Sequence, residues 1–162
     1  LHYRSHSFPT RRSSDLKDQI ISILNTIKSN QFIYYCSVDK EEQIDNVTLK
    51  PYSNKKFKMD LVACNGLLTN AGFQLPAEAI YLGKKILCKP LLGQPEQEHN
   101  AKILKRLEHA TVCLEFTKDK IEHWIQNGKQ KIELYNDSID LMIEMIENPK
   151  KDFANRISEL WI

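Results

Sequence analysis

The segment Thr69–Ala101 contains two turns whose residue types could bind an anion. The short apolar run Gly66–Thr69 ends in Asn70-Ala71-Gly72, and apolar residues at helical spacing begin at Phe73. This pattern predicts a strand, a tight turn and a helix. The start of such a helix carries unpaired backbone N–H groups and the positive end of the helix dipole, which together favour phosphate. The small residues Ala71 and Gly72 let an anion approach the backbone closely.

The spacing within this segment resembles that of a known family. A glutamate follows the turn glycine by six residues, a second glycine follows five later, and a proline closes the next apolar run; these are Gly72, Glu78, Gly83 and Pro90. The polar run Glu96-Gln97-Glu98-His99-Asn100-Ala101 comes next. The pattern resembles the carboxyl-terminal, donor-binding domain of GT-B glycosyltransferases, which include UDP-glycosyltransferases of plants and animals and the bacterial family 28 type that builds the peptidoglycan lipid precursor. Residues 70–94 are most similar to uncharacterised bacterial and archaeal proteins regarded as glycosyltransferases of this type.

The resemblance implies that these positions bind a nucleotide diphosphate sugar, the donor substrate of such enzymes. The turn would hold the diphosphate through Asn70, Ala71, Gly72 and Phe73, although Asn70 stands where many members have histidine. Glu78 would accept hydrogen bonds from the ribose hydroxyls, which suits a carboxylate with two acceptor oxygens. The sugar would contact Gln94, Glu96, Gln97 and Asn100, and the base would lie against the loop Pro51, Tyr52 and Ser53.

Each feature also has a purely structural explanation. A strand followed by a glycine turn and a helix is common in α/β proteins and is a weak motif by itself. Glu78 alone is typical of a solvated helix face, and Glu96-Gln97-Glu98 alone is typical of an acidic first turn that complements a helix dipole. The agreement of four spacings and two residue pairs over about thirty positions favours the ligand site.

The resemblance implies an enzyme that moves a sugar, of the hexosyl type, from the donor to an acceptor hydroxyl with inversion at the anomeric carbon. The general base would belong to an amino-terminal domain that this chain lacks, so the catalytic residue is unknown and the fragment alone is expected to be inactive. That domain is an expected partner and a candidate for peripheral membrane association. No metal and no cofactor besides the donor is implied. Two alternatives stay open: a nucleotide-sugar epimerase of the same architecture, and an inactive nucleotide-binding or interaction module.

The composition is typical of an ordinary soluble domain. The chain has 162 residues, of which 41% are hydrophobic and 27% charged, which suffices for one domain with a hydrophobic core. No apolar run approaches the ~18 residues that span a bilayer. The four cysteines lie far apart, without the close pairs of metal sites, and are expected to be buried and reduced in a cytoplasmic protein.

The first sixteen residues, LHYRSHSFPTRRSSDL, differ in pattern from the rest because they are basic and lack apolar periodicity. The part RSHSFPTRRSSDL resembles a translated sequencing adapter. We therefore expect residues 1–16 to be a non-native, disordered leader and the first strand of the domain to be missing. Arg4, Arg11 and Arg12 against Asp15 account for the whole formal charge of +2. The remainder is neutral, so the charge predicts no nucleic-acid binding.

From Lys17 the pattern alternates between helix and strand. Asp18 predicts the cap of a first helix; strands are then predicted over 31–38, 47–50, 66–69, 85–89 and 111–116, and further helices over 55–63, 73–82, 96–107 and 118–127, the last between Thr117 and a stop at Gly128. Residues 17–130 therefore predict an α/β fold, a Rossmann-like doubly wound parallel sheet with helices on both faces. Both turns fall at carboxyl ends of strands, where this fold binds ligands. Residues 131–162 predict carboxyl-terminal helices, with an apolar stripe along Ile132–Ile146 and a last helix over 152–161.

Overall fold

The computed structural model describes residues 2–4, 13–132, 139–148 and 151–159. The chain divides into two compact units, Leu1–Ile132 and Glu133–Ile162. The first unit contains the sheet with its covering helices, and the second unit contains two short helices.

The described part of the first unit contains a seven-stranded sheet with the order β3-β4-β2-β1-β5-β6-β7. All neighbouring strands are parallel except β3 and β4, which form an antiparallel pair. The strands are β1 (His2–Arg4), β2 (Phe32–Tyr35), β3 (Glu42–Ile44), β4 (Val47–Lys50), β5 (Gly66–Asn70), β6 (Lys85–Lys89) and β7 (Thr111–Val112). The chain runs outward from β1 through β2 to β4, and then outward in the other direction from β5 to β7. The sheet is therefore doubly wound, with its topological switch point between β1 and β5.

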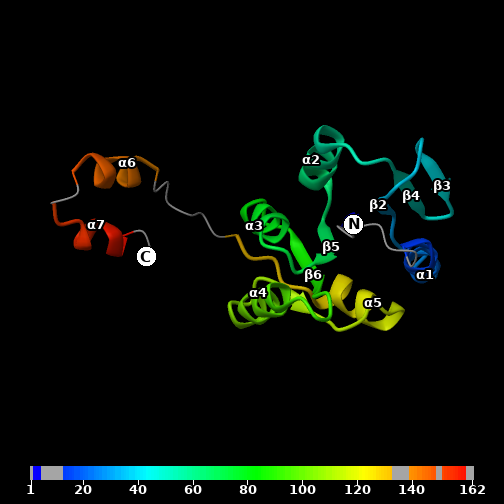
Figure 1. Ribbon diagram of the computed structural model, residues 1–162. Helices are drawn as coiled ribbons and strands as arrows, with labels where there is room; N and C mark the ends of the chain where they lie inside the picture. Colours follow the sequence, from blue (N-terminus) through cyan, green and yellow to red (C-terminus); the bar gives the residue numbers. More distant parts are fainter. Residues whose placement is uncertain (1, 5–12, 133–138, 149–150, 160–162) are drawn as a thin grey trace. The chain divides into compact units, whose positions relative to one another are not determined.

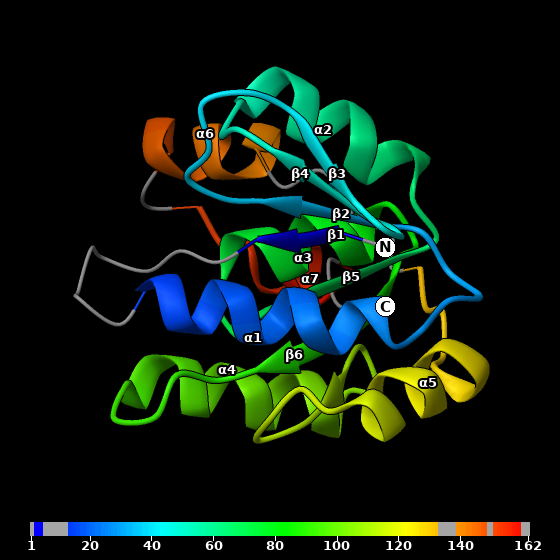
Figure 2. The same ribbon diagram turned by 90° about the vertical axis from the view of Figure 1, so that its right-hand side faces the viewer.

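Five helices of this unit cover both faces of the sheet, and the first four of them connect strands (Figure 1). They are α1 (Ser13–Asn25), α2 (Asn54–Ala63), α3 (Gln74–Tyr81), α4 (Pro95–Arg106) and α5 (Lys118–Asn127). Figure 2 looks onto the sheet from the side of α1 and α5. Helices α2, α3 and α4 cover the opposite face, as the membership of the two core clusters also shows. The predicted Rossmann-like fold is confirmed.

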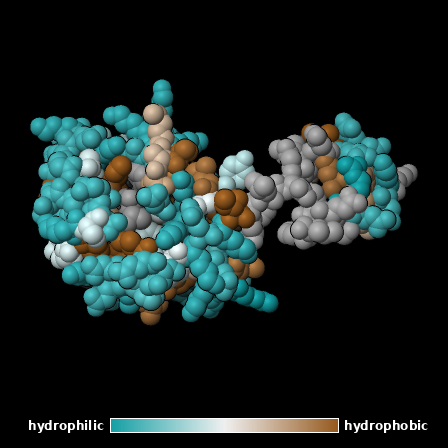
Figure 3. All heavy atoms as spheres, turned by 180° about the vertical axis from the view of Figure 1, so that it is seen from behind, coloured by the Kyte–Doolittle hydropathy of each residue, from teal (hydrophilic) through white to brown (hydrophobic). Residues whose placement is uncertain are grey.

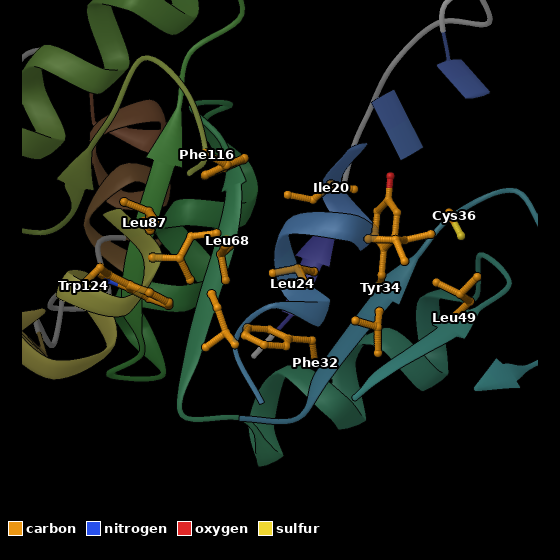
Figure 4. Packing of buried hydrophobic residues seen from close by; sticks show 14 of the residues in the cluster. Ile20, Leu24, Phe32, Tyr34, Cys36, Leu49, Leu68, Leu87, Phe116 and Trp124 are labelled. Atoms are coloured by element: carbon orange, nitrogen blue, oxygen red, sulfur yellow. The ribbon is translucent and has the colours of Figure 1, made fainter. Parts of the chain in front are cut away.

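The strands form the centre of the core because their side chains are buried on both faces, as in most parallel sheets. All five residues of β5 are buried. Alternate residues point to opposite faces, so Leu68 packs in the cluster below α1 and α5 while Leu67 packs in the cluster below α2, α3 and α4. Figure 4 shows the first cluster, in which Leu24 of α1 lies close to Phe32 of β2.

The carboxyl end of α1 is held by a side chain from another element. The amide nitrogen of Asn46, which follows the β3–β4 turn, lies 3.1, 2.9 and 2.8 Å from the carbonyl oxygens of Leu24, Ile27 and Asn30. Asn46 is 5% exposed. Leu24 lies in the last turn of α1, and Ile27 and Asn30 follow the helix; the Leu24 and Ile27 carbonyls also accept the N–H groups of Ile27 and Asn30. The Asn46 amide therefore joins the end of α1 to the segment that follows it.

The ends of the other helices follow familiar rules. Ser53 and Thr117 cap α2 and α5, because each hydroxyl accepts a hydrogen bond from the backbone N–H three residues later. Gly83, with φ +62°, ends α3 in a Schellman motif, in which its N–H bonds to Ile80 and that of the next residue bonds to Ala79. Gly128 has φ −62° and needs no left-handed backbone. A Cβ there would lie 2.5 Å from the Trp124 carbonyl oxygen, so this glycine is required by space.

The structure differs from the predicted elements mainly near the chain start and at the sheet edges. His2–Arg4 holds the position of the first strand, and α1 begins at Ser13, whereas a disordered leader and a missing first strand are expected from the sequence. Strand pairing uses backbone groups, which do not depend on the sequence, so β1 does not show whether residues 1–16 are native. Their origin therefore stays a prediction. Strand β7 is two residues long, and β3 is not predicted at all.

The second unit contains two short helices among its described residues, α6 (Ile139–Glu147) and α7 (Ala154–Glu159). Leu141 and Phe153 are buried, and Glu144 accepts hydrogen bonds from Lys151 and Arg156. The predicted stripe from Ile132 is interrupted, since this residue lies before α6 and outside any helix. Tyr135 and Trp161 of the predicted helices, and Pro149 between these helices, lie outside the described residues.

Within the parts of the chain that the structure describes, every helix is too short or too polar to traverse a lipid bilayer.

Candidate functional site

The first turn lies at the switch point of the sheet. Strand β5 ends at Asn70, and the turn Ala71–Phe73 leads directly into α3. Because β5 pairs with β1 on one side and β6 on the other, this turn projects from the carboxyl edge where the two halves of the sheet diverge. Doubly wound sheets bind ligands at this place.

The start of α3 has free hydrogen-bonding capacity. Phe73 precedes the helix, and no side chain caps it, in contrast to α2 and α5. The backbone N–H groups of Gln74 and Leu75 lie in the first helical turn of α3 and have no acceptor within the helix. Pro76 has no N–H and adds no donor. Two aligned donors and the positive end of the helix dipole therefore point outward from the amino-terminal end of α3. This arrangement is suited to an anion.

A pocket of about 200 Å³ opens at this turn. Its lining comes from the end of β5, the turn, the first half of α3 and one residue of α4: Thr69, Asn70, Gly72, Phe73, Gln74, Leu75, Glu78 and Gln97. Pockets that enclose drug-sized ligands measure roughly 300–1,000 Å³. This pocket could therefore hold part of a nucleotide sugar, such as a phosphate with its ribose.

Gly72 is a glycine that the chain's own packing does not require. A Cβ at this position would meet nothing within 4 Å, and its φ lies outside the left-handed region. Gly72 is also one of the residues that line the pocket. A ligand that approaches the backbone at this point would explain why a residue without a side chain stands here.

Glu78 lies one turn into α3 and lines the same pocket. Its Oε1 accepts a hydrogen bond of 2.9 Å from the side-chain amide of Gln74. Its Oε2 has no hydrogen bond to another described residue, so an acceptor oxygen is left for a hydroxyl donor.

The second turn, which leads from β6 into α4, contacts the first turn through side chains of α4. The Gln97 side-chain oxygen accepts the N–H of Leu91 at 3.1 Å, which leaves the Gln97 amide nitrogen for the pocket that it lines. The Asn100 side-chain nitrogen donates to the carbonyl of Ala71 at 3.2 Å and so ties α4 to the first turn. The remaining predicted sugar contacts, Gln94 and Glu96, are exposed and outside the pocket lining.

The predicted base loop lies away from this pocket. Pro51, Tyr52 and Ser53 follow β4, which is separated from β5 by β2 and β1. The Ser53 hydroxyl caps α2, and Tyr52 is 55% exposed. The loop therefore lies at the same edge of the sheet but at a distance of several strands.

A hydrogen-bonded cluster at the base of this loop is not apparent from the sequence. The Asp60 carboxylate accepts hydrogen bonds from the Tyr35 hydroxyl at 2.6 Å and the Lys50 ammonium at 2.8 Å. Burial, together with the Asp60 charge, raises the pKa of the Tyr35 hydroxyl far above its usual value. The three residues come from β2, β4 and α2, so only the fold brings them together.

The cysteines and acidic residues show no metal-binding arrangement in the described part of the chain. No group of three His, Cys, Asp or Glu side chains there could hold a metal ion. The four cysteines are free thiols, and three of them are buried. Burial raises the pKa of the Cys88 thiol to about 12, so this thiol is protonated and unreactive at neutral pH.

Comparisons with known proteins agree with this fold. The structure is similar to the spinosyn forosaminyltransferase SpnP, with a TM-score of 0.55 and 17% identity over 78% of this chain and 34% of that one. It is also similar to a glycotransferase of kitacinnamycin, with a TM-score of 0.58 and 16% identity over 74% of this chain and 32% of that one. The chain thus spans about a third of the length of each. No curated protein matches the sequence.

The fold is that of part of two solved glycosyltransferases, in agreement with the GT-B fold that the sequence resemblance implies. The sequence matches the family described as Glycosyl transferase family 1 over residues 10–128. The chain belongs to this family.

Proposed function

We propose that this chain is the donor-binding domain of a glycosyltransferase that moves a sugar from a nucleotide diphosphate sugar to an acceptor hydroxyl. The observation that carries the proposal is the uncapped start of α3, which faces a pocket at the switch point of the sheet. Family membership supports the reaction class.

The diphosphate would bind across the turn Asn70–Phe73. The N–H groups of Gln74 and Leu75 would donate to its oxygens, and the open space at Gly72 would admit it to the backbone. When the bond between sugar and diphosphate breaks, negative charge grows on the departing diphosphate. Fixed backbone donors and the helix dipole stabilise that charge without a metal ion.

The other pocket residues would bind the ribose and the sugar. Glu78 would accept hydrogen bonds from ribose hydroxyls through its unused oxygen, and Gln97 would donate its amide to the sugar. Asn100 would act mainly as a positioning residue, because its amide is bound to the Ala71 carbonyl of the first turn. Glu96 and Gln94 would reach the sugar from the exposed start of α4.

The rest of the enzyme would come from a second domain. The pocket is smaller than a whole nucleotide sugar, and the chain covers a third of its solved relatives. The second domain would supply the general base for an inverting transfer of a hexose and would complete the cleft. A cytoplasmic location and membrane association through that domain stay predictions.

A thermal-shift titration tests donor binding. A donor present at about 100 times its dissociation constant should add about 2.7 kcal/mol to the free energy of unfolding. We expect at least one uridine, guanosine or thymidine diphosphate sugar to raise the Tm, and Glu78→Ala to weaken the effect. Glu122→Ala is the matched control, because Glu122 is also a helical acid with a side-chain partner four residues earlier, on α5. Binding that is equal in both variants, or absent throughout, would contradict the proposal.

Product analysis separates the transferase from the epimerase. The present chain should bind the donor without consuming it, because the proposed base lies elsewhere. A protein that carries both domains should transfer sugar only when an acceptor is present. Formation of an epimer from the donor alone would overturn the transferase assignment.

A further inference from the structure

The outward face of α2 combines lysines with exposed apolar side chains. The inward face contains Phe57 and Leu61, which are 3% and 1% exposed. At 3.6 residues per turn, Met59 and Val62 lie on the opposite side of the helix, and they are 63% and 59% exposed. A helix at the surface of a globular domain usually has polar residues on this side.

Three lysines surround these apolar residues. Lys55, Lys56 and Lys58 are exposed, and none of them has an ion pair with another residue in the described parts of the chain. Asp60 is the acid of this helix, but its carboxylate is bound to the Lys50 ammonium at 2.8 Å. The three lysines therefore give this face a positive charge.

These five residues, which we call the α2 outer patch, are Lys55, Lys56, Lys58, Met59 and Val62. Figure 3 shows hydrophobic surface among hydrophilic atoms at the end of the larger unit where Figure 1 places α2. The combination differs from a simply solvated face, because two of its outermost side chains would gain free energy by leaving water.

We propose that the α2 outer patch binds the surface of a membrane that contains anionic lipids. Lysines are attracted to anionic headgroups, while their alkyl stems and the Met59 and Val62 side chains enter the boundary between headgroups and acyl chains. The patch lacks the arginines and aromatic rings that stack on nucleic-acid bases, which favours lipid over nucleic acid as the occupant. This inference does not depend on donor binding, and the surface belongs to this chain rather than to a second domain.

Vesicle co-sedimentation of the full chain tests the proposal. The chain should bind phosphatidylcholine vesicles that contain about 30% phosphatidylserine, and it should bind pure phosphatidylcholine much more weakly. Binding should fall when salt is raised from about 0.05 M to about 0.5 M, because counterions screen the lysines. Each lysine near an anionic surface contributes roughly fivefold, so Lys55→Gln/Lys56→Gln/Lys58→Gln should weaken binding roughly 100-fold.

A second variant separates insertion from charge. Met59→Ser/Val62→Ser keeps every charge and should weaken binding to the anionic vesicles at least about fivefold, because it removes the inserted apolar groups. Both variants change exposed side chains, so their circular dichroism and Tm should match those of the wild type.

Matched controls carry the same or similar charge changes elsewhere. Lys102→Gln/Lys105→Gln/Arg106→Gln removes three positive charges from α4, and Arg11→Gln/Arg12→Gln removes two from the basic chain start. Both should bind the anionic vesicles as the wild type does. The proposal is overturned if the wild type does not bind, if the α2 variants bind equally well, or if either control loses as much binding as the lysine variant.

Discussion

Gly72, Glu78 and Gln97 come from a turn, from α3 and from α4, yet they line one pocket. Each offers something that a diphosphate sugar needs: space beside the backbone, an unused acceptor oxygen and an amide donor. The packing around these residues requires neither the lack of a side chain at Gly72, nor the unused Glu78 oxygen, nor the Gln97 amide nitrogen. At the residue scale, this convergence supports the donor site better than any single side chain does.

Gly72→Ala should separate binding from folding. The new methyl group meets open space, so the free energy of unfolding should stay within about 0.5 kcal/mol of the wild type or rise slightly. The same methyl group would occupy the space that the diphosphate needs, so the affinity for uridine diphosphate should fall at least about 10-fold. Urea denaturation and calorimetric titration measure the two effects.

Gly128→Ala provides the opposite case, because its Cβ would clash with the Trp124 carbonyl at 2.5 Å. It should destabilise the fold by about 1–3 kcal/mol while the folded protein keeps its affinity. A Gly72→Ala variant that unfolds, or that binds as the wild type does, would show that the glycine has another role.

The candidate site could be predicted in part from residue spacing. The family resemblance assigns Asn70, Gly72, Phe73, Glu78 and Gln97 to one site, and all five line one pocket. Their roles in donor binding stay predictions. The bond from Asn100 to Ala71 could not be predicted, because it joins residues 29 positions apart. The cluster of Tyr35, Lys50 and Asp60 likewise depends on three elements that meet only after folding.

At the element scale, Asn46→Ala should destabilise the protein substantially. The substitution removes the buried amide that joins the Leu24, Ile27 and Asn30 carbonyls, and the loss of buried hydrogen bonds is costly. We expect a loss of about 2 kcal/mol in the free energy of unfolding, measured by urea denaturation.

Asn127→Ala is the matched control for this experiment. Its amide also donates to a backbone carbonyl, that of His123 at 3.1 Å, but the bond is exposed to water. Its loss should change the free energy of unfolding by no more than about 0.5 kcal/mol. Equal effects of the two substitutions would refute a special role for the buried Asn46 amide.

Periodicity predicts elements well where burial dictates the residues. The bounds of β6 and α5 agree with the prediction because apolar residues and a Thr117 cap mark them clearly. Strand β3 has three exposed residues and therefore leaves no hydrophobic pattern. The sequence signal that could have indicated a hairpin is the residue type at the turn after β3. Asp45 adopts φ +58° there, a conformation that aspartate tolerates in hairpins.

For the whole molecule, stability should fall in alkaline solution. Burial raises the pKa of the Cys88 thiol from 9.0 to about 12, and Cys113 adds to the shift. Between these values the unfolded chain releases the proton while the folded chain keeps it. The contribution of this thiol is therefore fully present below pH 9, and roughly 1 kcal/mol is lost per pH unit above it.

Urea denaturation from about pH 8 to about pH 11 measures this slope. The other buried thiols and Tyr35 shift in the same direction, so Cys88→Ala should make the decline shallower without abolishing it. A slope that Cys88→Ala leaves unchanged would show that this thiol does not couple folding to pH.

At the scale of the molecule, the alternation of strands and helices was sufficient to predict a doubly wound sheet and hence the edge where the site lies. The same alternation did not define the second unit, because helical spacing extended the predicted apolar stripe of α6 back to Ile132. In the structure Ile132 belongs to the first unit, where it lies 2.6 Å from the position of a Cβ on Gly83. Such a contact between distant residues has no periodic signature.

Donor binding at the α3 turn is tested most directly by a backbone amide NMR titration of this chain with uridine diphosphate. We expect the amide signals of Gly72, Phe73, Gln74 and Leu75 to shift most, because they surround the site proposed for the diphosphate. Glu78→Ala should weaken the binding and leave the same turn as the centre of the shifts. Shifts centred on another helix start, or no saturable shift at the α3 turn with any nucleoside diphosphate, would contradict the proposed donor site.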